Sequence, residues 1–413
     1  MKLAFRVVIF TVLAAGLVFL SAGPGFPQKI ETVDGVRVVH NPAAGKWGKT
    51  PPITLQPVRV IGDVDTEDEN FAFNRPSDLA VDSQGRLHVL DTGNNRIQVF
   101  DREGKFVKTI GRRGQGPGEF FMPESMAFDG AGNLYVVEGN NGRIQQITPE
   151  GKIGKTWKLD PGLGKIHLPS SGQLLLAGGG TGLGGMFQLN GGSLNANAEL
   201  PPLAKFINSD GKTVKEFGRG AAFDDPMVTR TANTLTSSLD SSDNLFLAFI
   251  NQNRVEKYAS DGRLLWRADR ELAYPMEIKG KGKLSDESKS SNLTSYRLTL
   301  PTMTKCMTAS AVDDKGRLWV VTMARQLRDN EKVQTSFSYS TGSGGSNASS
   351  KTTGAVDLRT TDAFKLEIFD ADGVLLGSIP VGIFVDGIFI KGDRLFLTDR
   401  DRGCQIHEFR IKE

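Results

Sequence analysis

The sequence predicts an all-β protein built as a closed ring of similar sheets, and three observations support this prediction. A segment that begins at Pro76 is followed from Pro123 by a variant of itself, and self-similarity at a period of about 40 to 50 residues marks stacked structural units. Its first half recurs along the chain as two apolar runs around a tight polar turn, the pattern of an antiparallel hairpin. A single predicted strand near the start of the repeats and an incomplete last unit at the end of the chain can together form one complete sheet. Together these features predict a six-bladed β-propeller of four-stranded antiparallel blades.

The first hairpin of the unit occurs in six copies. They are LAVDSQGRLHVLD (79–91), MAFDGAGNLYVVE (126–138), IHLPSSGQLLLAG (166–178), SSLDSSDNLFLAF (237–249), SAVDDKGRLWVVT (310–322) and IFIKGDRLFLTD (388–399). Every second run contains a leucine at the same position: Leu87, Leu134, Leu174, Leu245, Leu318 and Leu395. The next residue in each copy is His88, Tyr135, Leu175, Phe246, Trp319 or Phe396. Because successive side chains of a strand point to opposite faces, these positions predict two packing layers in each sheet.

A second hairpin follows each of the first five copies, but the sixth copy is incomplete. The second hairpins are 95–111, 142–158, 203–218, 253–269 and 364–380. After the sixth first hairpin the chain has room for one more strand, 404–413, whereas an isolated strand, 57–62, precedes the first unit. Pairing these two strands completes the last blade and removes the exposed edges of an open array. The propeller is therefore expected to span 57–413.

The first residues have the order of an export signal. Lys2 and Arg6 precede an apolar run, 7–20, and small residues follow it, so 1–23 is predicted to be a signal peptide, with an uncleaved anchor as the alternative. No second apolar stretch of spanning length follows, so we expect no membrane span in the mature protein and a periplasmic or extracellular location. The proline-rich segment 24–56 is predicted to be an arm that lies against the ring, with a short hairpin at Asp34-Gly35.

The overall charge gives no indication of a nucleic-acid partner. The formal net charge is +3 over 413 residues, and no basic stripe that would neutralise phosphates stands out. We expect a monomer without a cofactor.

One stretch of the repeat resembles a known family. The run GRRGQGPGEFFMPESMAFDGAGNLYVVEGNNGRIQQITPEGK (111–152) resembles an NHL repeat, and the chain resembles exported bacterial six-bladed propellers built from such units. Two copies depart from the pattern, with Pro169 and Lys391 in place of the usual aspartate. The resemblance implies a propeller with a polar axial channel, which most relatives use as a binding platform and a minority use as an enzyme.

The loops indicate which side of the ring binds. Turns within each hairpin are short, whereas all three long insertions, 178–202, 269–305 and 323–362, leave from the opposite side. We call this side the decorated face. Within the last insertion, 331–360 is predicted to be a flexible low-complexity segment because of its Ser, Thr and Gly content. Since loops on a rigid scaffold commonly carry recognition, the decorated face is predicted to bind a protein, peptide or glycan.

Residues near the axis are the candidates for a site. The start of each innermost strand should place one residue at a common level: Asp78, Ser125, Lys165, Thr236, Ala309 and Gly387. Four charged residues lie just outside that level: Arg75, Glu124, Arg230 and Asp386. From these two groups the predicted binding residues are Arg75, Asp78, Glu124, Lys165, Arg230 and Asp386.

Candidate catalytic residues are few, and no catalytic or metal-ligating residue is predicted. His40, His88, His167 and His407 do not have the spacing of a zinc site and are interpreted as packing or surface residues. Asp91, Glu138 and Asp399, with the arginines that follow them, are interpreted as ties between turns. The alternative function is a calcium-dependent hydrolase or lyase of the gluconolactonase type at the axial mouth, with oxygen ligands from Asp78, Glu124 and Asp386.

The two cysteines leave one structural question open. Cys306 and Cys404 are both expected toward the decorated face on neighbouring blades. An exported protein permits a disulfide, although strand geometry is expected to keep the sulfurs apart. Thus both the bonded and the free state remain open from the sequence.

Overall fold

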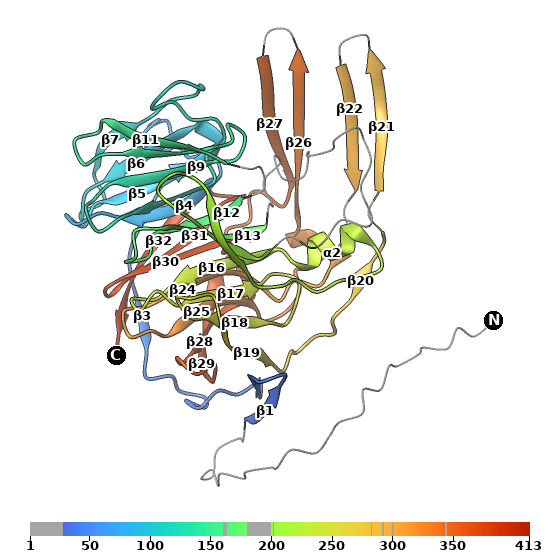
Figure 1. The fold of residues 1–413 in the computed structure, drawn as a ribbon. Coiled ribbons are helices and arrows are strands. Elements are labelled where there is room, and N and C mark those ends of the chain that lie inside the picture. The colour runs from blue at the N-terminus through green and yellow to red at the C-terminus, as the bar shows by residue number, and fades with distance from the viewer. Residues whose placement is uncertain are drawn as a thin grey trace.

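The computed structural model describes residues 28–159, 163–179, 200, 202–281, 283–290, 293–299, 301–342 and 345–413. The predicted signal peptide, 1–23, lies outside the described residues. Six sheets form a closed ring, which confirms the six-bladed propeller (Figure 1). None of the helices in the described part of the chain is long and apolar enough to cross a membrane.

The first three blades each consist of four consecutive strands, numbered from the axis outward. Blade 1 contains β4 (Pro76–Val81), β5 (Leu87–Asp91), β6 (Arg96–Phe100) and β7 (Phe106–Ile110). Blade 2 contains β8 (Ser125–Phe128), β9 (Leu134–Glu138), β10 (Arg143–Ile147) and β11 (Ile153–Lys158). Blade 3 contains β12 (Leu163–His167), β13 (Leu174–Gly179), β14 (Ala204–Ile207) and β15 (Thr213–Phe217).

Blades 4 and 6 gain strands from the N-terminal part of the chain, and the sequence of blade 5 is interrupted between its second and third strands. Blade 4 contains β16 (Leu235–Leu239), β17 (Leu245–Phe249), β18 (Val255–Tyr258) and β19 (Leu264–Arg270). Blade 5 contains β24 (Met307–Val312), β25 (Leu318–Met323), β28 (Thr360–Phe369) and β29 (Leu375–Ile383). Blade 6 contains β30 (Gly387–Lys391), β31 (Arg394–Asp399), β32 (Gln405–Lys412) and β3 (Thr54–Ile61).

An aspartate shapes the turn of most first hairpins. The Asp82 carboxylate accepts hydrogen bonds from the backbone N–H groups of Gln84 and Arg86, at 3.0 and 2.9 Å, and Gly85 adopts a positive φ of 79° that favours glycine. Equivalent carboxylates belong to Asp129, Asp240 and Asp313. These bonds hold the turns short, so this face of the ring is uniform.

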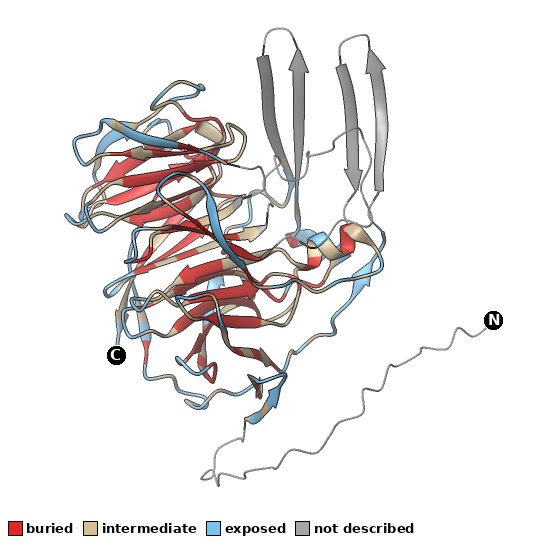
Figure 2. Cartoon of the chain, viewed as in Figure 1, coloured by how far each residue is buried: buried red, intermediate tan, exposed pale blue. Residues whose placement is uncertain are grey.

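The apolar layers predicted from the repeats are the core of the blades. The six equivalent leucines are at most 4% exposed, and their six neighbours are at most 9% exposed. The clusters cross from blade to blade, since Trp319 of blade 5 packs in one cluster with Ile388 and Leu395 of blade 6. Figure 2 shows buried residues along the inner parts of the sheets. Each blade is therefore stabilised by its neighbours as much as by its own hydrogen bonds.

The N-terminal arm runs along the outside of three blades. Strands β1 (Lys29–Val33) and β2 (Val36–Asn41) form the expected hairpin at Asp34-Gly35, and β2 extends blade 4 by pairing in parallel with β19. The Asn41 side chain then bridges to blade 5, where its amide donates to the Gly373 carbonyl at 3.0 Å and its oxygen accepts from the Leu375 N–H at 2.8 Å. The parallel addition to blade 4 was not predicted from the sequence.

The ring closes where the two ends of the propeller meet. Strand β3 pairs antiparallel with β32 from Thr54↔Lys412 to Ile61↔Ile406. Pro57 is tolerated because β3 is an edge strand, where a missing N–H leaves no ladder bond unmade. The predicted closing strand, 57–62, thus begins three residues earlier and ends one residue earlier in the structure.

The insertions form structure of their own on the decorated face. The 269–305 insertion contains β20 (Ile278–Lys279), β23 (Thr302–Met303) and a hairpin of β21 (Lys283–Ser290) with β22 (Leu293–Thr299). The 323–362 insertion contains a longer hairpin of β26 (Val333–Gly342) with β27 (Gly345–Gly354). Both hairpins project from the same side of the ring (Figure 1). Most of the third insertion, 180–199 and 201, lies outside the described residues.

Two of these connections contain regular structure that the sequence did not predict. The segment 331–360, predicted to be flexible and of low complexity, contains the paired strands β26 and β27. Its flexibility stays a prediction. The blade 3 to blade 4 connection contains the helix α2 (Pro226–Ala232), which Asp225 caps through the N–H groups of Met227 and Val228.

Truncation tests the closure separately from the arm. Removing residues 1–62 deletes β3 and leaves β32 as an unpaired edge, so we expect a broader urea transition and self-association in size-exclusion chromatography. Removing only residues 1–52 deletes the arm but keeps β3, and this control should unfold in a single sharp transition. If both truncated proteins unfold as sharply and remain as soluble as the intact chain, β3 does not seal the ring.

Candidate functional site

A polar cavity opens at the axis on the decorated face. Its volume is about 430 Å³. It is lined by the six residues expected at one level, namely Asp78, Ser125, Lys165, Thr236, Ala309 and Gly387. The charged residues Glu124, Lys305, Asp386 and Arg400 also line it. Four of the six predicted binding residues are therefore brought together here, whereas Arg75 and Arg230 are not among its lining residues.

Asp78 is fully committed to contacts inside the ring. One carboxylate oxygen lies 3.3 Å from the Lys165 ammonium, and it also accepts from the N–H of Leu79 at 3.0 Å. The other accepts from the Ser125 hydroxyl and from the N–H of Met126, each at 2.9 Å. These contacts join blades 1, 2 and 3 at the axis. Asp78 and Lys165 thus serve mainly to hold the mouth together.

Unlike Asp78, Glu124 has no hydrogen-bond donor or cation paired with its carboxyl group among the described residues. Its carboxyl group lines the cavity, and no hydrogen bond or ion pair joins it to another of the described residues. Its oxygens lie against Gly139, where an added Cβ would be 2.4 Å from Oε1. Burial alone raises the pKa of Glu124 to about 7. A carboxyl group that titrates near neutral pH and faces a cavity is a typical functional-site candidate.

The remaining predicted residues have different surroundings. Asp386 accepts from the N–H of Arg400 at 3.1 Å, on the loop that follows β31. Arg75 lies beside that loop, with its Nε 3.7 Å from the Asp401 carboxylate, and burial lowers the pKa of its guanidinium. Arg230 belongs to α2, and burial lowers its pKa too. Arg75 therefore lies near the cavity residues Asp386 and Arg400 without lining the cavity, and Arg230 does not line it either.

Hydroxyl and imidazole groups connect the inner strands of blades 3 to 6. His167 Nε2 and Ser237 Oγ are 2.8 Å apart, and Thr236 Oγ1 and Ser310 Oγ are 3.4 Å apart. Thr308 donates to the carbonyl of Val385 at 2.9 Å. Burial lowers the pKa of His167 to about 3, with a smaller contribution from Lys165, so its imidazole is neutral. His167 is thus a buried connecting residue, in agreement with its interpretation as a packing residue.

The opposite mouth of the channel has a different character. There a cavity of about 700 Å³ is lined by one apolar residue from the end of five first strands: Val81, Phe128, Leu239, Val312 and Ile390. Sequence reasoning missed this ring, although the third residue of each copy of the first hairpin, which includes Leu168, carries the signal. The two mouths therefore differ in the residues of the first strands, which are polar or small on the decorated face and apolar on the face of short turns, where charged turn residues such as Asp82 and Lys391 complete the lining.

The repeated acids at the ends of second strands stabilise turns. Glu138 accepts from the Arg143 guanidinium at 2.8 Å, from Gln145 at 2.7 Å and from the N–H of Phe121 at 3.0 Å. Asp91 pairs with Arg96 at 2.8 Å in the same way. The structural interpretation of these two pairs is confirmed. Asp399 of blade 6 also stabilises its turn, by accepting from the backbone N–H groups of Arg402 and Gly403 at 3.2 and 2.8 Å. The Arg402 guanidinium donates instead to the backbone carbonyl of Glu331, and Arg254 of blade 4 donates to Glu256.

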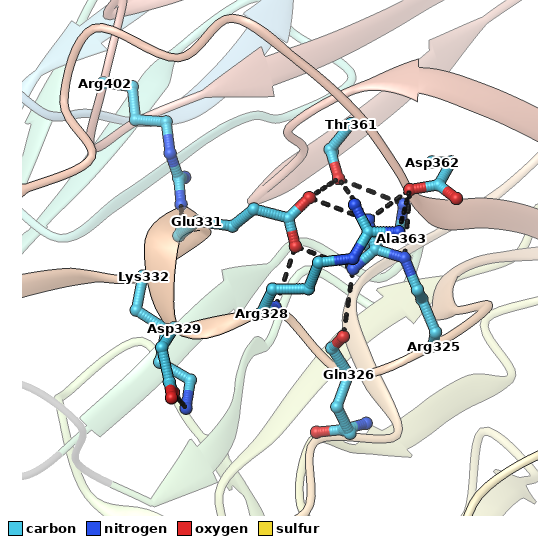
Figure 3. Close-up of polar contacts among 10 residues, drawn as sticks. All are labelled: Arg325, Gln326, Arg328, Asp329, Glu331, Lys332, Thr361, Asp362, Ala363 and Arg402. Atoms are coloured by element: carbon cyan, nitrogen blue, oxygen red, sulfur yellow. Dashed lines mark hydrogen bonds and ion pairs between the residues drawn. The ribbon is translucent and has the colours of Figure 1, made fainter.

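An ionic clamp fixes the base of the β26–β27 hairpin (Figure 3). Arg325 donates to both oxygens of Glu331, each at 2.7 Å, and to Asp362. Glu331 also accepts from the Arg328 N–H at 2.8 Å and the Thr361 hydroxyl at 3.0 Å. The Arg325 bonds lower the pKa of Glu331 to about 2. Since Arg402 of blade 6 donates to the Glu331 carbonyl at 2.8 Å, the clamp joins the hairpin to two blades.

The cysteines are not bonded to each other. Cys306 and Cys404 are both free and buried, in separate apolar clusters. Burial raises the pKa of each thiol to about 11, so neither is a reactive thiolate at neutral pH. Within the described ranges, no three His, Cys, Asp or Glu side chains are grouped closely enough to hold a metal ion.

Comparisons with known proteins agree with the fold. Residues 56–148 match a family model described as a 6-bladed beta-propeller. A solved structure of a member of the DUF4221 family from Bacteroides vulgatus is 11% identical, aligns over 88% of this chain and all of that one, and gives a TM-score of 0.54. A gluconolactonase from Xanthomonas campestris is 12% identical over 90% of this chain and 97% of that one, with a TM-score of 0.46. The likeness to the DUF4221 structure shows the fold alone.

Two curated proteins share short stretches with this chain. The B-box type zinc finger protein ncl-1 of Caenorhabditis elegans is 59% identical over 34 residues, which is 8% of this chain. Protein brain tumor of Drosophila melanogaster is 46% identical over 43 residues, which is 10% of this chain. The matched stretch covers only 4% of the length of either relative. The similarity is therefore local to a segment of about one repeat in length.

Removing the clamp should release the hairpin. The substitution Arg325→Gln leaves the Glu331 carboxylate without its main partner, which we expect to cost about 2 kcal/mol of local stability. Limited trypsin cleavage within 331–360 should then be roughly 30-fold faster, while global unfolding changes little. Asp329→Asn, which removes an exposed ion pair with Lys332 but keeps every trypsin site, is the matched control and should leave the rate unchanged. Equal cleavage rates in all three proteins would show that the clamp does not hold the hairpin.

The same clamp predicts how acid acts on the hairpin. The folded-state pKa of Glu331, about 2, lies below its usual value of 4.5, so its contribution is complete above about pH 4.5 and is lost as the pH falls toward 2. Cleavage by pepsin within 331–360 should therefore accelerate between pH 4 and pH 2 in the wild type. In Arg325→Gln the segment is already released at pH 4, so the acceleration should be much smaller. An equal acceleration in both would contradict the assignment.

Proposed function

We propose that the chain is an exported propeller of the NHL type that binds a protein, peptide or glycan on its decorated face. The observation that carries this proposal is the arrangement of two described hairpins and the polar cavity on one side of the ring, while the other side has only short turns. A binding surface of this kind uses a rigid scaffold to hold variable loops around a central polar mouth.

The attachment of the β26–β27 hairpin to the ring supports a role in recognition rather than a loop insertion that has no function. A loop that lengthens without function needs no fixed base, since extra length is thermodynamically inexpensive. Here Glu331 is held by Arg325, Arg328 and Thr361, and its carbonyl is held by Arg402. A fixed base presents the hairpin in a constant direction, which lowers the entropy lost when a partner binds.

The alternative of a calcium-dependent hydrolase or lyase finds less support. Calcium needs six to eight oxygen ligands that converge on one point. Of its three candidate ligands, Asp78 already accepts from Ser125, Leu79 and Met126 and pairs with Lys165. Glu124 and Asp386 do not form a group with it that could hold an ion. The described residues therefore do not fit a calcium site of this kind.

Shortening the hairpin tests the proposal. Replacing 334–353 by two glycines removes most of β26 and β27 but keeps the clamp, so the ring should remain folded. We expect retention from a native envelope extract, and on an array of bacterial glycans, to fall at least tenfold relative to wild type. Lys391→Glu on the face of short turns is the control and should retain both. Loss of binding in Lys391→Glu with full binding by the shortened protein would place recognition on the other face and overturn the proposal.

A further inference from the structure

Glu124 differs from the buried acids of the ring, because its side chain is only partly buried and its carboxyl group has no donor among the described residues. Asp91 accepts from the Asn74 N–H, from Asn94 and from Arg96 within 2.8 Å. Glu138 and Asp78 each have four hydrogen-bond or ion-pair contacts. Folded proteins rarely leave a buried polar group without a partner, and exceptions call for an explanation. Among the described residues, the carboxyl group of Glu124 has none, and it faces a cavity.

The position of Glu124 is determined by its surroundings. Its backbone N–H donates to the carbonyl of Val137 at 2.8 Å, and its carbonyl accepts from the Ser77 hydroxyl at 3.4 Å. The side chain then lies over Gly139, the one residue type that leaves room for both carboxylate oxygens. The backbone and the neighbouring glycine thus hold an acceptor at the cavity wall instead of allowing it to turn toward bulk water.

The other charged groups of the cavity are engaged or lie at its edge. Lys165 pairs with Asp78 at 3.3 Å, and Asp386 accepts from the N–H of Arg400 at 3.1 Å. Lys305 is exposed, and the Arg400 guanidinium lies 4.0 Å from Asp401. Burial is the cause of the raised pKa of Glu124, and none of these charged groups makes a hydrogen bond or ion pair with it. The acceptor is therefore free to pair with a group brought by a ligand.

We propose that the axial cavity takes a primary ammonium group, with the Glu124 carboxylate as its ion-pair partner. An ammonium group has three N–H donors and no acceptor. Beside Glu124, the cavity supplies hydroxyl acceptors from Ser77, Ser125, Thr236, Ser237, Thr308 and Ser310. A charge-assisted bond in a site shielded from water is the contact that best offsets the burial of a carboxylate. The volume of about 430 Å³ accommodates a lysine side chain or a small diamine.

This inference rests on the proposed function and gives it a chemistry: a partner on the decorated face inserts an amine into the axial mouth. It also predicts a dependence on pH. Glu124 must be ionised to pair with a cation, and its pKa is about 7. The ionised fraction rises from about a tenth at pH 6 to about nine-tenths at pH 8. Affinity for an amine should therefore rise about tenfold between these pH values, and binding near pH 7 should release protons.

Calorimetric titration of the purified full chain tests this with defined probes. Cadaverine represents a free diamine, and an end-blocked Gly-Lys-Gly peptide represents a lysine side chain. The same peptide with an acetylated lysine lacks the charge. We expect both amines to bind about tenfold more tightly at pH 8 than at pH 6, and the acetylated peptide not to bind. Binding of the peptide but not cadaverine identifies a protein partner as the source of the amine, and the reverse identifies a small polyamine.

Three variants make the test specific to Glu124. Glu124→Gln should weaken amine binding at pH 8 at least tenfold and abolish its pH dependence. Asp372→Asn, the same chemical change at an exposed acid in the turn between β28 and β29, should keep both the affinity and the pH midpoint. Gly139→Ala retains the charge of Glu124 but displaces its carboxylate, so it should also weaken binding. If Glu124→Gln does not fold, Gly139→Ala still decides the question.

Several outcomes would overturn the inference. They are no amine binding to folded protein at pH 8, an affinity independent of pH, and equal affinity in the Glu124→Gln variant. Binding of neutral cellobiose instead of amines would assign the cavity to polyols. The titration does not depend on the β26–β27 hairpin, so a failure here is distinct from a failure of the hairpin experiment.

Discussion

The pairing of β3 with β32 is the constraint on which the rest of the structure depends. These strands lie at opposite ends of the propeller sequence, yet they are neighbours over eight residues of β3. Without this pairing the repeat would be an open array with an exposed edge at blade 6. The seal fixes the number of blades and therefore the width of the axial channel. The arm reinforces it, since it contacts blades 4 and 5 before it reaches blade 6.

A closed ring gives the molecule two unlike mouths. The inner strands all run in the same direction, so equivalent positions of six strands meet at one level. At the start of these strands the residues are polar or small and include the connected pair Asp78 and Lys165. Near their ends the residues are apolar, as Phe128 and Leu239 illustrate. The same direction of travel sends every long connection to the polar mouth. The common direction of the inner strands thus determines both which face carries the long loops and which residue types line each mouth of the channel.

Features that recur in every blade could be predicted from the sequence, whereas contacts that occur only once in the structure could not. The six leucines, the closing strand and the residues around the polar mouth could be found because equivalent positions recur. The addition of β2 to blade 4 could not, since it joins Arg37 to Trp266 with no local signal in either segment. Nor could spacing distinguish Glu124 from Asp78. Both are acids near the axis, but only the three-dimensional contacts show that one is saturated with donors and the other is not.

Native-state hydrogen exchange measured strand by strand is the most direct test of the sealed ring. If closure holds the propeller together, the amides of β3 and β32 that pair with each other should exchange only through global unfolding. They should then share the opening free energy of the buried strand β17 in blade 4. Exchange of the β3 and β32 amides through a separate opening of much lower free energy, with β17 still protected, would show that the ring persists without its seal and would contradict this account.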